Sequence, residues 1–385
     1  MAFLKLAIQV AVSANRLLTN SVISLVLCVG SAVCAQAQDA QPGGSGESWT
    51  VTTETSVNNS NPSRTMESHA KSGNRNVDKQ RVEVLGPNGR YQPDSETEKE
   101  TIRVDASTTR TVVRAYTWDG NGQRKLAQVM EEDARSTPTG EAQVVRTTSN
   151  SDVNGNLHIV QREVADTRKT GPDAQETKTT VYLANGNGGF ATARQTQELQ
   201  TRGADHRVEE KKTTLVPDGN GNWRVGEVTE KTIREDGKNR TTEERVLRPD
   251  IEGRLSESSR TVGEEAETTE GERSHTVDTY STNVPGLTGD GRLHLNQRVT
   301  TVQKKNSDGE ITEQQVEQPN PGNPTDGRQV RARTKYVVRY GGSGMQQTKT
   351  VQERNGNGTL DVVSVETRKS DQPPPAPQTP PDKPH

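Results

Sequence analysis

The sequence predicts an all-β protein, an antiparallel meander of long strands built from about eight to nine hairpin repeats of about 33 residues. Three observations predict it: a glycine that recurs at a nearly fixed interval, turn-forming residues before it, and apolar residues at strand spacing on both sides. The intervals between these marker glycines are 33, 33, 33, 33, 32, 38, 36 and 31 residues. The markers are Gly89, Gly122, Gly155, Gly188, Gly221, Gly253, Gly291, Gly327 and Gly358.

The residues before each marker predict a tight turn. Asn, Asp or Glu always precedes the glycine, and six copies carry Asp or Asn three residues before it, as in Asp119-Gly120-Asn121-Gly122. Asp or Asn at the first position and Gly at the fourth favour a type I β-turn, and the glycine tolerates a positive φ. The pattern fits either a three-residue hairpin with a bulge or a two-residue type I′ turn.

Large apolar residues crowd both sides of the same turn. In seven copies one follows the marker by two residues: Tyr91, Leu157, Phe190, Trp223, Leu255, Leu293 and Leu360. A spacing of two places side chains on one face of a strand. We expect these residues to align into a stripe, with Phe190 and Trp223 near its centre, that a thin curled or folded-over sheet buries. The alternative is that Trp118, Tyr182 and Trp223 are exposed as stacking platforms for a polysaccharide.

A weaker second turn divides each repeat into two long strands, for example around Gly140, Gly203 and Gly237. One such hairpin cannot fold alone, because ordering 33 residues costs roughly 30–60 kcal/mol of backbone entropy. Stability must therefore come from pairing between neighbouring repeats. The pattern leaves open whether the sheet is open, curled, or closed as a sandwich or barrel.

The first 37 residues resemble a secretory signal. Lys5 and Arg16 are the only charges, and an apolar run precedes the cleavage pattern Ala35-Gln36-Ala37. The alternative is a signal retained as a membrane anchor. Both cysteines, Cys28 and Cys34, lie inside it, so the mature chain would hold no disulfide. We expect an exported protein, extracellular, at the cell surface or periplasmic, with a flexible leader (38–47), a repeat domain (48–370) and a proline-rich tail (371–385).

Composition and motifs exclude several classes of site. The six histidines are scattered and no nucleophile motif occurs, so neither an enzyme nor a cofactor is predicted. The turn at Asp152 and Asn154 has half of a calcium-loop pattern but no glutamate at its end, which leaves only weak calcium binding open. A net charge of −3 with interspersed signs argues against nucleic acid. The charged strands argue against an outer-membrane barrel and against any membrane span after signal cleavage.

The unit from Asp152 to Leu157, of the form Asp-x-Asn-Gly-x-Leu, resembles half of the repeat of secreted bacterial YD/RHS-type proteins. The resemblance covers about six residues per repeat, and the Arg-Tyr half of that repeat is missing. It implies a secreted β-hairpin array at a cell surface. Together with the signal and the repeats, it predicts a non-enzymatic scaffold or adhesin-like structural module whose partner is a polysaccharide or another surface protein. The alternative is a carbohydrate-binding or carbohydrate-processing protein that uses the sheet face.

Overall fold

A computed structural model describes residues 47–57, 61–203, 205–268, 272–287, 290–306, 309–320, 322–324, 327–341 and 344–370. The predicted signal, the leader up to residue 46 and the predicted tail lie outside these residues. No helix among them is long and apolar enough to cross a membrane.

The described chain consists of twenty strands joined by turns. They are β1 (Glu47–Val57), β2 (Ser63–Ser72), β3 (Arg75–Leu85), β4 (Tyr91–Arg103), β5 (Thr108–Trp118), β6 (Arg124–Ser136), β7 (Ala142–Ser151), β8 (Leu157–Gly171), β9 (Ala174–Ala184), β10 (Phe190–Arg202), β11 (Val208–Pro217), β12 (Trp223–Asp236), β13 (Asn239–Pro249), β14 (Leu255–Glu267), β15 (Arg273–Ser281), β16 (His294–Asn306), β17 (Gly309–Pro319), β18 (Arg328–Gly341), β19 (Gly344–Arg354) and β20 (Leu360–Ser370).

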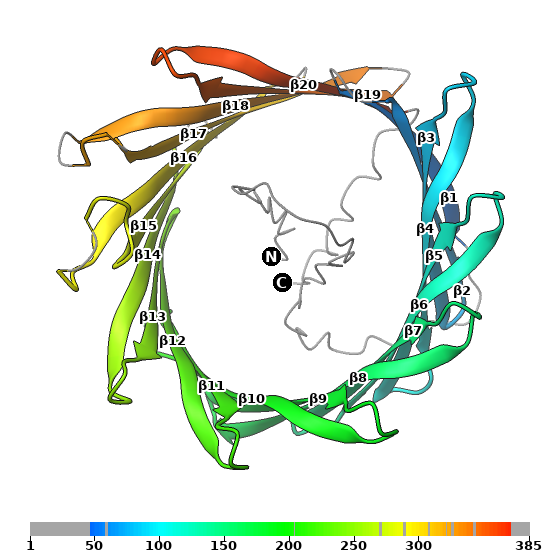
Figure 1. Ribbon diagram of the computed structural model, residues 1–385, viewed down its shortest axis with the longest axis horizontal. Coiled ribbons are helices and arrows are strands. Elements are labelled where there is room, and N and C mark those ends of the chain that lie inside the picture. The colour runs from blue at the N-terminus through cyan, green and yellow to red at the C-terminus, as the bar shows by residue number, and fades with distance from the viewer. Residues whose placement is uncertain are drawn as a thin grey trace, which may run out of the picture.

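Each strand pairs antiparallel with the next, and β1 also pairs with β20, so the sheet closes into a barrel (Figure 1). The predicted all-β antiparallel meander is confirmed, with two strands per repeat. The predicted thin curled or folded-over sheet is wrong, because closure gives the first and last strands hydrogen-bonding partners in place of two free edges. The seam is short: Thr53–Val57 of β1 pairs with Glu366–Ser370 of β20.

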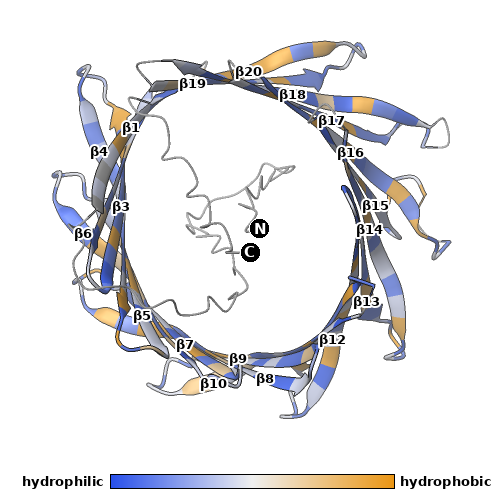
Figure 2. Ribbon diagram, turned by 180° about the vertical axis from the view of Figure 1, so that it is seen from behind, coloured by the Kyte–Doolittle hydropathy of each residue, from blue (hydrophilic) through white to orange (hydrophobic). Residues whose placement is uncertain are grey.

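The wall is one sheet thick, and little of it is buried. The buried apolar side chains include Val112, Val113, Met130 and Val228, which lie within the strands. Hydrophilic residues predominate along the ribbons in Figure 2, in agreement with a mean hydropathy of −0.95. Stability therefore rests mainly on strand pairing around the ring.

The marker glycines occupy nine alternate connections, β3–β4 through β19–β20, which we call the primary turns; the connections at the opposite end are the secondary turns. All nine markers have positive φ, for example 74° at Gly122 and 84° at Gly155. In the turn at Gly122, its amide donates to the Asp119 carbonyl (2.9 Å), and the Asp119 amide donates to Gln123 (3.0 Å). This is the three-residue hairpin with a bulge.

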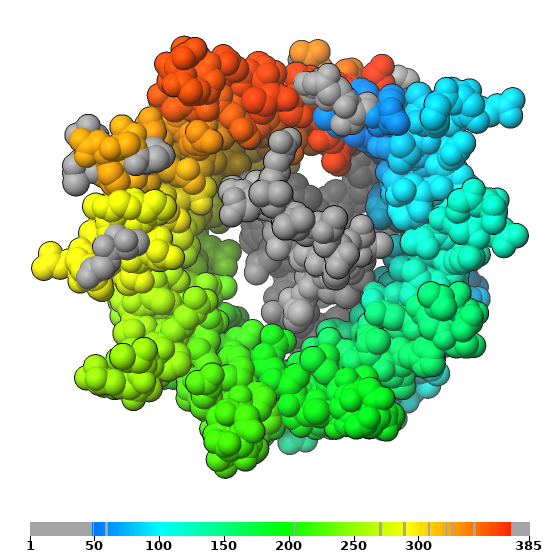
Figure 3. All heavy atoms as spheres, in the orientation of Figure 1, coloured from blue at the N-terminus to red at the C-terminus, as the bar shows by residue number. Residues whose placement is uncertain are grey.

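A second bulge follows each primary turn inside the outgoing strand. The unpaired residue lies five positions after the marker in eight copies and four in the ninth. These residues are Asp94, Ala127, Val160, Ala193, Gly226, Ser258, Asn296, Arg331 and Val363. Bulges bend and twist a strand locally. The primary-turn hairpins accordingly spread outward around the ring (Figures 1 and 3).

Replacing Gly122 by Val is expected to destabilise the protein by at least about 1 kcal/mol, because a β-branched residue is strained at positive φ. Gly120 is the matched control: it lies in the same turn, outside the left-handed region, and an added Cβ would meet nothing within 4 Å at either position. Urea unfolding of both variants checks this. Equal loss of stability at the two sites would contradict the strain account.

Candidate functional site

The register decides which side chains share a face of the wall. Directly paired residues point to the same side, and this assignment stays consistent around all twenty strands. Outward-facing residues can then be identified from one hydrogen bond: the Leu85 amide in β3 donates to Pro62 beside the preceding strand β2 (2.8 Å).

The chirality of L-residues then shows whether Leu85 faces outward or toward the lumen. Figure 1 views the barrel from the primary-turn end, and the chain runs clockwise. In a strand that ascends toward that end, an L-residue whose side chain points at an outside observer directs its own N–H and C=O to the observer's right. The preceding strand lies on that side. Leu85 and the residues in register with it therefore face outward, and the alternate set faces the lumen.

Outward residues beside the primary turns are strongly apolar, and we call them the outer belt. Its large members are Leu85, Tyr91, Tyr116, Trp118, Leu126, Leu157, Ile159, Tyr182, Phe190, Leu215, Trp223, Val225, Leu247, Leu255, Tyr280, Leu295, Leu360 and Val362. Seven of the nine aromatic side chains that the structure describes belong to it. The other two, Tyr336 and Tyr340, face the lumen in the half of β18 next to its secondary turn.

The predicted stripe exists, with Phe190 and Trp223 on one face, but the prediction that it is buried is wrong. Phe190 is 43% exposed, Trp223 37% and Leu157 45%. Burial fails because a closed barrel cannot fold its own sheet over its outer surface. Trp118, Tyr182 and Trp223, predicted as alternative stacking platforms, lie in this outward ring.

Arginines contact several belt aromatics. The Arg124 guanidinium lies 3.5 Å from the centre of the Tyr116 ring, and Arg64 lies 4.7 Å from that of Tyr91. Such cation–π contacts hold a charge beside an apolar surface. Belt and arginines together resemble the amphipathic composition found where protein meets the headgroups of a bilayer.

Below the belt the outer wall carries ion pairs between neighbouring strands. Arg114 of β5 lies 3.4 Å from a Glu100 oxygen and 3.6 Å from a Glu98 oxygen of β4. On the far side of the barrel, Arg298 of β16 donates through Nε to Asp278 of β15 at 2.6 Å. Most of these side chains are half-buried. The positive and negative charges of this part of the wall largely compensate each other through these ion pairs.

The turn carboxylates accept hydrogen bonds from backbone amides. The Asp152 carboxylate accepts the amides of Asn154 and Asn156, each at 2.8 Å, and His158 lies 3.2 Å away. The amide of Asn156 is the largest influence that lowers the pKa of Asp152, to about 2. Asp218 and Asp250 have lowered pKa values for the same reason, hydrogen bonds from backbone amides. These oxygens stabilise turns, and no metal-ligating cluster occurs within the described ranges.

The lumen face carries threonine hydroxyls and, among the described residues, fewer ion pairs than the outer wall. The Thr167 and Thr177 hydroxyls lie 2.9 Å apart across β8 and β9. Arg146 bridges Glu132 (3.0 Å through Nε) and Glu163 (3.1 Å through Nη1). Hydroxyls and compensated charges suit contact with water and polar solutes.

No family model matches the chain, and no curated protein matches it. Among solved structures, it is similar to the outer membrane protein opdK from Pseudomonas aeruginosa, with 10% identity and a TM-score of 0.40 over 85% of this chain and 98% of that one. It is also similar to the siderophore receptor PirA from the same organism, with 9% identity and a TM-score of 0.37 over 86% of this chain and 81% of that one. At these values the likeness says nothing about what this chain binds or transports.

Closure overturns three predictions about function. A closed ring with a lumen contradicts the secreted scaffold, the adhesin-like structural module and the carbohydrate protein, all of which were predicted for a sheet that does not enclose a lumen. It also corrects the prediction of no membrane-spanning structure, because a closed barrel, like a helix, satisfies its own backbone hydrogen bonds in lipid. The charged strands appeared to exclude such a barrel because their cross-strand pairing is not visible in the sequence. The predicted export agrees with this architecture.

Proposed function

We propose that the protein is an exported, membrane-seated β-barrel that gives solutes an aqueous passage. The observation that carries this proposal is the outer belt, a band of exposed and half-buried large apolar and aromatic side chains on eight of the nine primary-turn hairpins, at one rim of a closed barrel. Contiguous exposed apolar surface of this kind marks a protein or membrane contact. A band that continues around most of the barrel fits the surrounding lipid of a bilayer better than a single protein partner.

The composition of the belt supports lipid as its environment. Trp and Tyr concentrate at bilayer interfaces, where an apolar ring and a polar tip are both satisfied. Arg64 and Arg124, beside Tyr91 and Tyr116, can extend their charges toward headgroups while their stems stay against the rings.

The belt also sets the depth of insertion. It covers about four residues of each strand, or about 13 Å at 3.4 Å per residue. Strand tilt near 40° reduces this to a height of about 10 Å, against the band of about 25 Å in single-chain outer-membrane barrels. We therefore expect the bilayer to thin around the belt so that the barrel still crosses it, with the ion-paired wall at Glu98, Glu100 and Arg114 standing at or outside the membrane surface.

Conductance across a planar lipid bilayer tests the passage. The folded protein is expected to produce discrete, stable conductance steps whose frequency rises with protein concentration. Protein unfolded in urea and added at the same final denaturant concentration is the control. A bilayer that remains at baseline conductance after addition of folded protein would refute the proposed passage.

A further inference from the structure

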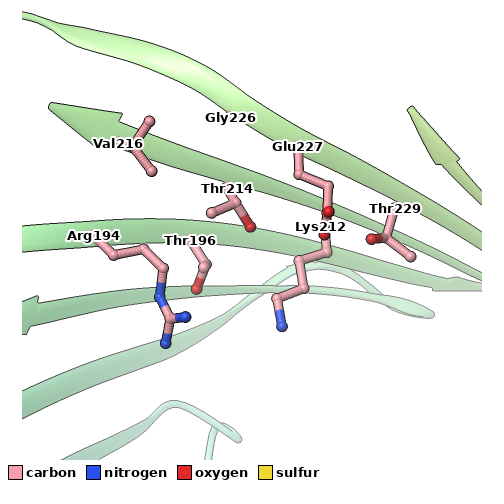
Figure 4. Close-up of a pocket in the computed structure, with 8 residues that line it drawn as sticks. All are labelled: Arg194, Thr196, Lys212, Thr214, Val216, Gly226, Glu227 and Thr229. Carbon is pink, nitrogen blue, oxygen red and sulfur yellow. The ribbon is translucent and has the colours of Figure 1, made fainter. Parts of the chain in front are cut away.

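The lumen wall contains a hollow across β10, β11 and β12, a cavity of about 330 Å³ (Figure 4). Its polar lining residues are Arg194, Thr196, Lys212, Thr214, Glu227 and Thr229, and Gly226 also lines it. The register places the side chains on one face, since Thr196 pairs with Thr214 and Lys212 pairs with Thr229. That face is the lumen side of the wall.

The hollow exists because a side chain is missing at one bulge. Gly226 is the unpaired residue of β12, and the equivalent position in the other eight outgoing strands carries a side chain. Its φ is not in the left-handed region, so the backbone does not require glycine. The limited space favours glycine instead, because a Cβ at Gly226 would lie 3.2 Å and 3.3 Å from the two Val216 methyl carbons.

Two cations, Arg194 and Lys212, line the hollow, and neither is joined to a carboxylate by an ion pair among the described residues. Within the described ranges, neither Arg194 nor Lys212 makes a side-chain hydrogen bond or ion pair. The nearby carboxylates are engaged elsewhere: Glu227, which also lines the hollow, pairs with Arg248 at 2.9 Å, and Glu210 accepts from Gln200 at 3.1 Å. Glu198 lies opposite Lys212 in register, but no ion pair joins them.

We propose that this hollow binds the oxyanion group of a small solute, a phosphate or a carboxylate, in the barrel lumen. The Arg194 guanidinium offers a planar fork that can donate two parallel hydrogen bonds to one such group. Lys212 supplies a second positive charge, and the threonine hydroxyls of residues 196 and 214 supply neutral donors. Rings and patches of Arg and Lys select anions in other pores. The inference deepens the proposed passage by naming its solute class.

Isothermal titration of the folded barrel in detergent with inorganic phosphate tests the site without a bilayer, so it remains informative even where conductance fails. Saturable binding to one site is expected. Arg194→Gln and Lys212→Gln are each expected to weaken it at least tenfold, and Glu198→Gln to tighten it by removing the carboxylate that lies opposite Lys212 in the register. Gly226→Leu should also weaken binding, because the added side chain fills the hollow.

Lys99→Gln is the matched control. Lys99 also faces the lumen, from β4, and no ion pair or hydrogen bond of its side chain occurs in the described part of the chain. Its replacement is expected to leave phosphate binding unchanged. Absence of saturable binding to the wild type would overturn the proposal. So would an equal loss in Lys99→Gln and Lys212→Gln, which would indicate general electrostatic attraction in the lumen.

Discussion

Replacing Phe190 and Trp223 together by glutamate is expected to release the protein from lipid vesicles. Both side chains face outward beside primary turns of successive hairpins, and both are exposed in the isolated chain. The change removes two large apolar surfaces and places two charges where lipid is expected. A charged residue on the lipid face costs up to about 2–4 kcal/mol at the midplane and less near the interface. Even about 1.4 kcal/mol in total weakens partitioning tenfold.

Vesicle flotation in a density gradient measures this effect. The wild type is expected to float with the lipid, and the double variant to remain at the bottom. Tyr340→Glu is the matched control, because Tyr340 is an aromatic residue 52% exposed that faces the lumen away from the belt. If Tyr340→Glu releases the protein as completely as the belt variant does, the belt is not the contact with lipid.

The local structure could be predicted because local residues determine it. The Asp119-to-Gly122 pattern and its copies determine turn geometry within a few residues, since the carboxylate accepts amides two and four positions ahead. Apolar residues two positions beyond each glycine lie on one strand face by period alone. Both features repeat along the chain, so the hairpins, the approximate number of repeats and the shared face of Phe190 and Trp223 could be predicted from the sequence.

Closure could not be predicted, because it depends on contacts between the two ends of the chain. The pairing of Thr53–Val57 with Glu366–Ser370 joins residues more than 300 positions apart, and neither segment differs in composition from an ordinary internal strand. The charged strands led to the wrong prediction, against a membrane barrel, for a related reason. Arg114 is compensated by Glu98 and Glu100 only once the register between β4 and β5 is known. The candidate anion site likewise requires three strands to be aligned before Arg194, Lys212 and Gly226 meet.

The seam between β1 and β20 is expected to be the weakest joint of the ring, so a disulfide across it should stabilise the barrel strongly. It holds five register pairs, whereas each pair of consecutive strands holds eight or more. Thr55 and Arg368 are direct register partners. Thr55 belongs to the lumen-facing set of β1, whose backbone groups bond to β2, so it forms a non-hydrogen-bonded pair with Arg368, in which side chains lie closest.

The Thr55→Cys/Arg368→Cys variant, made with Cys28 and Cys34 replaced by serine, should form the bond on mild oxidation. The cross-link closes a loop of about 300 residues, which in the chain-entropy account is worth about 6 kcal/mol. Thr229→Cys/Val246→Cys is the control across an internal pair, β12–β13. Its short loop gives about 3 kcal/mol in the same account and leaves the seam open. Urea unfolding of oxidised and reduced forms measures both gains. Failure of the two seam cysteines to cross-link in the folded protein, while the internal pair does so, would mean that β1 and β20 are not neighbours and the ring is open.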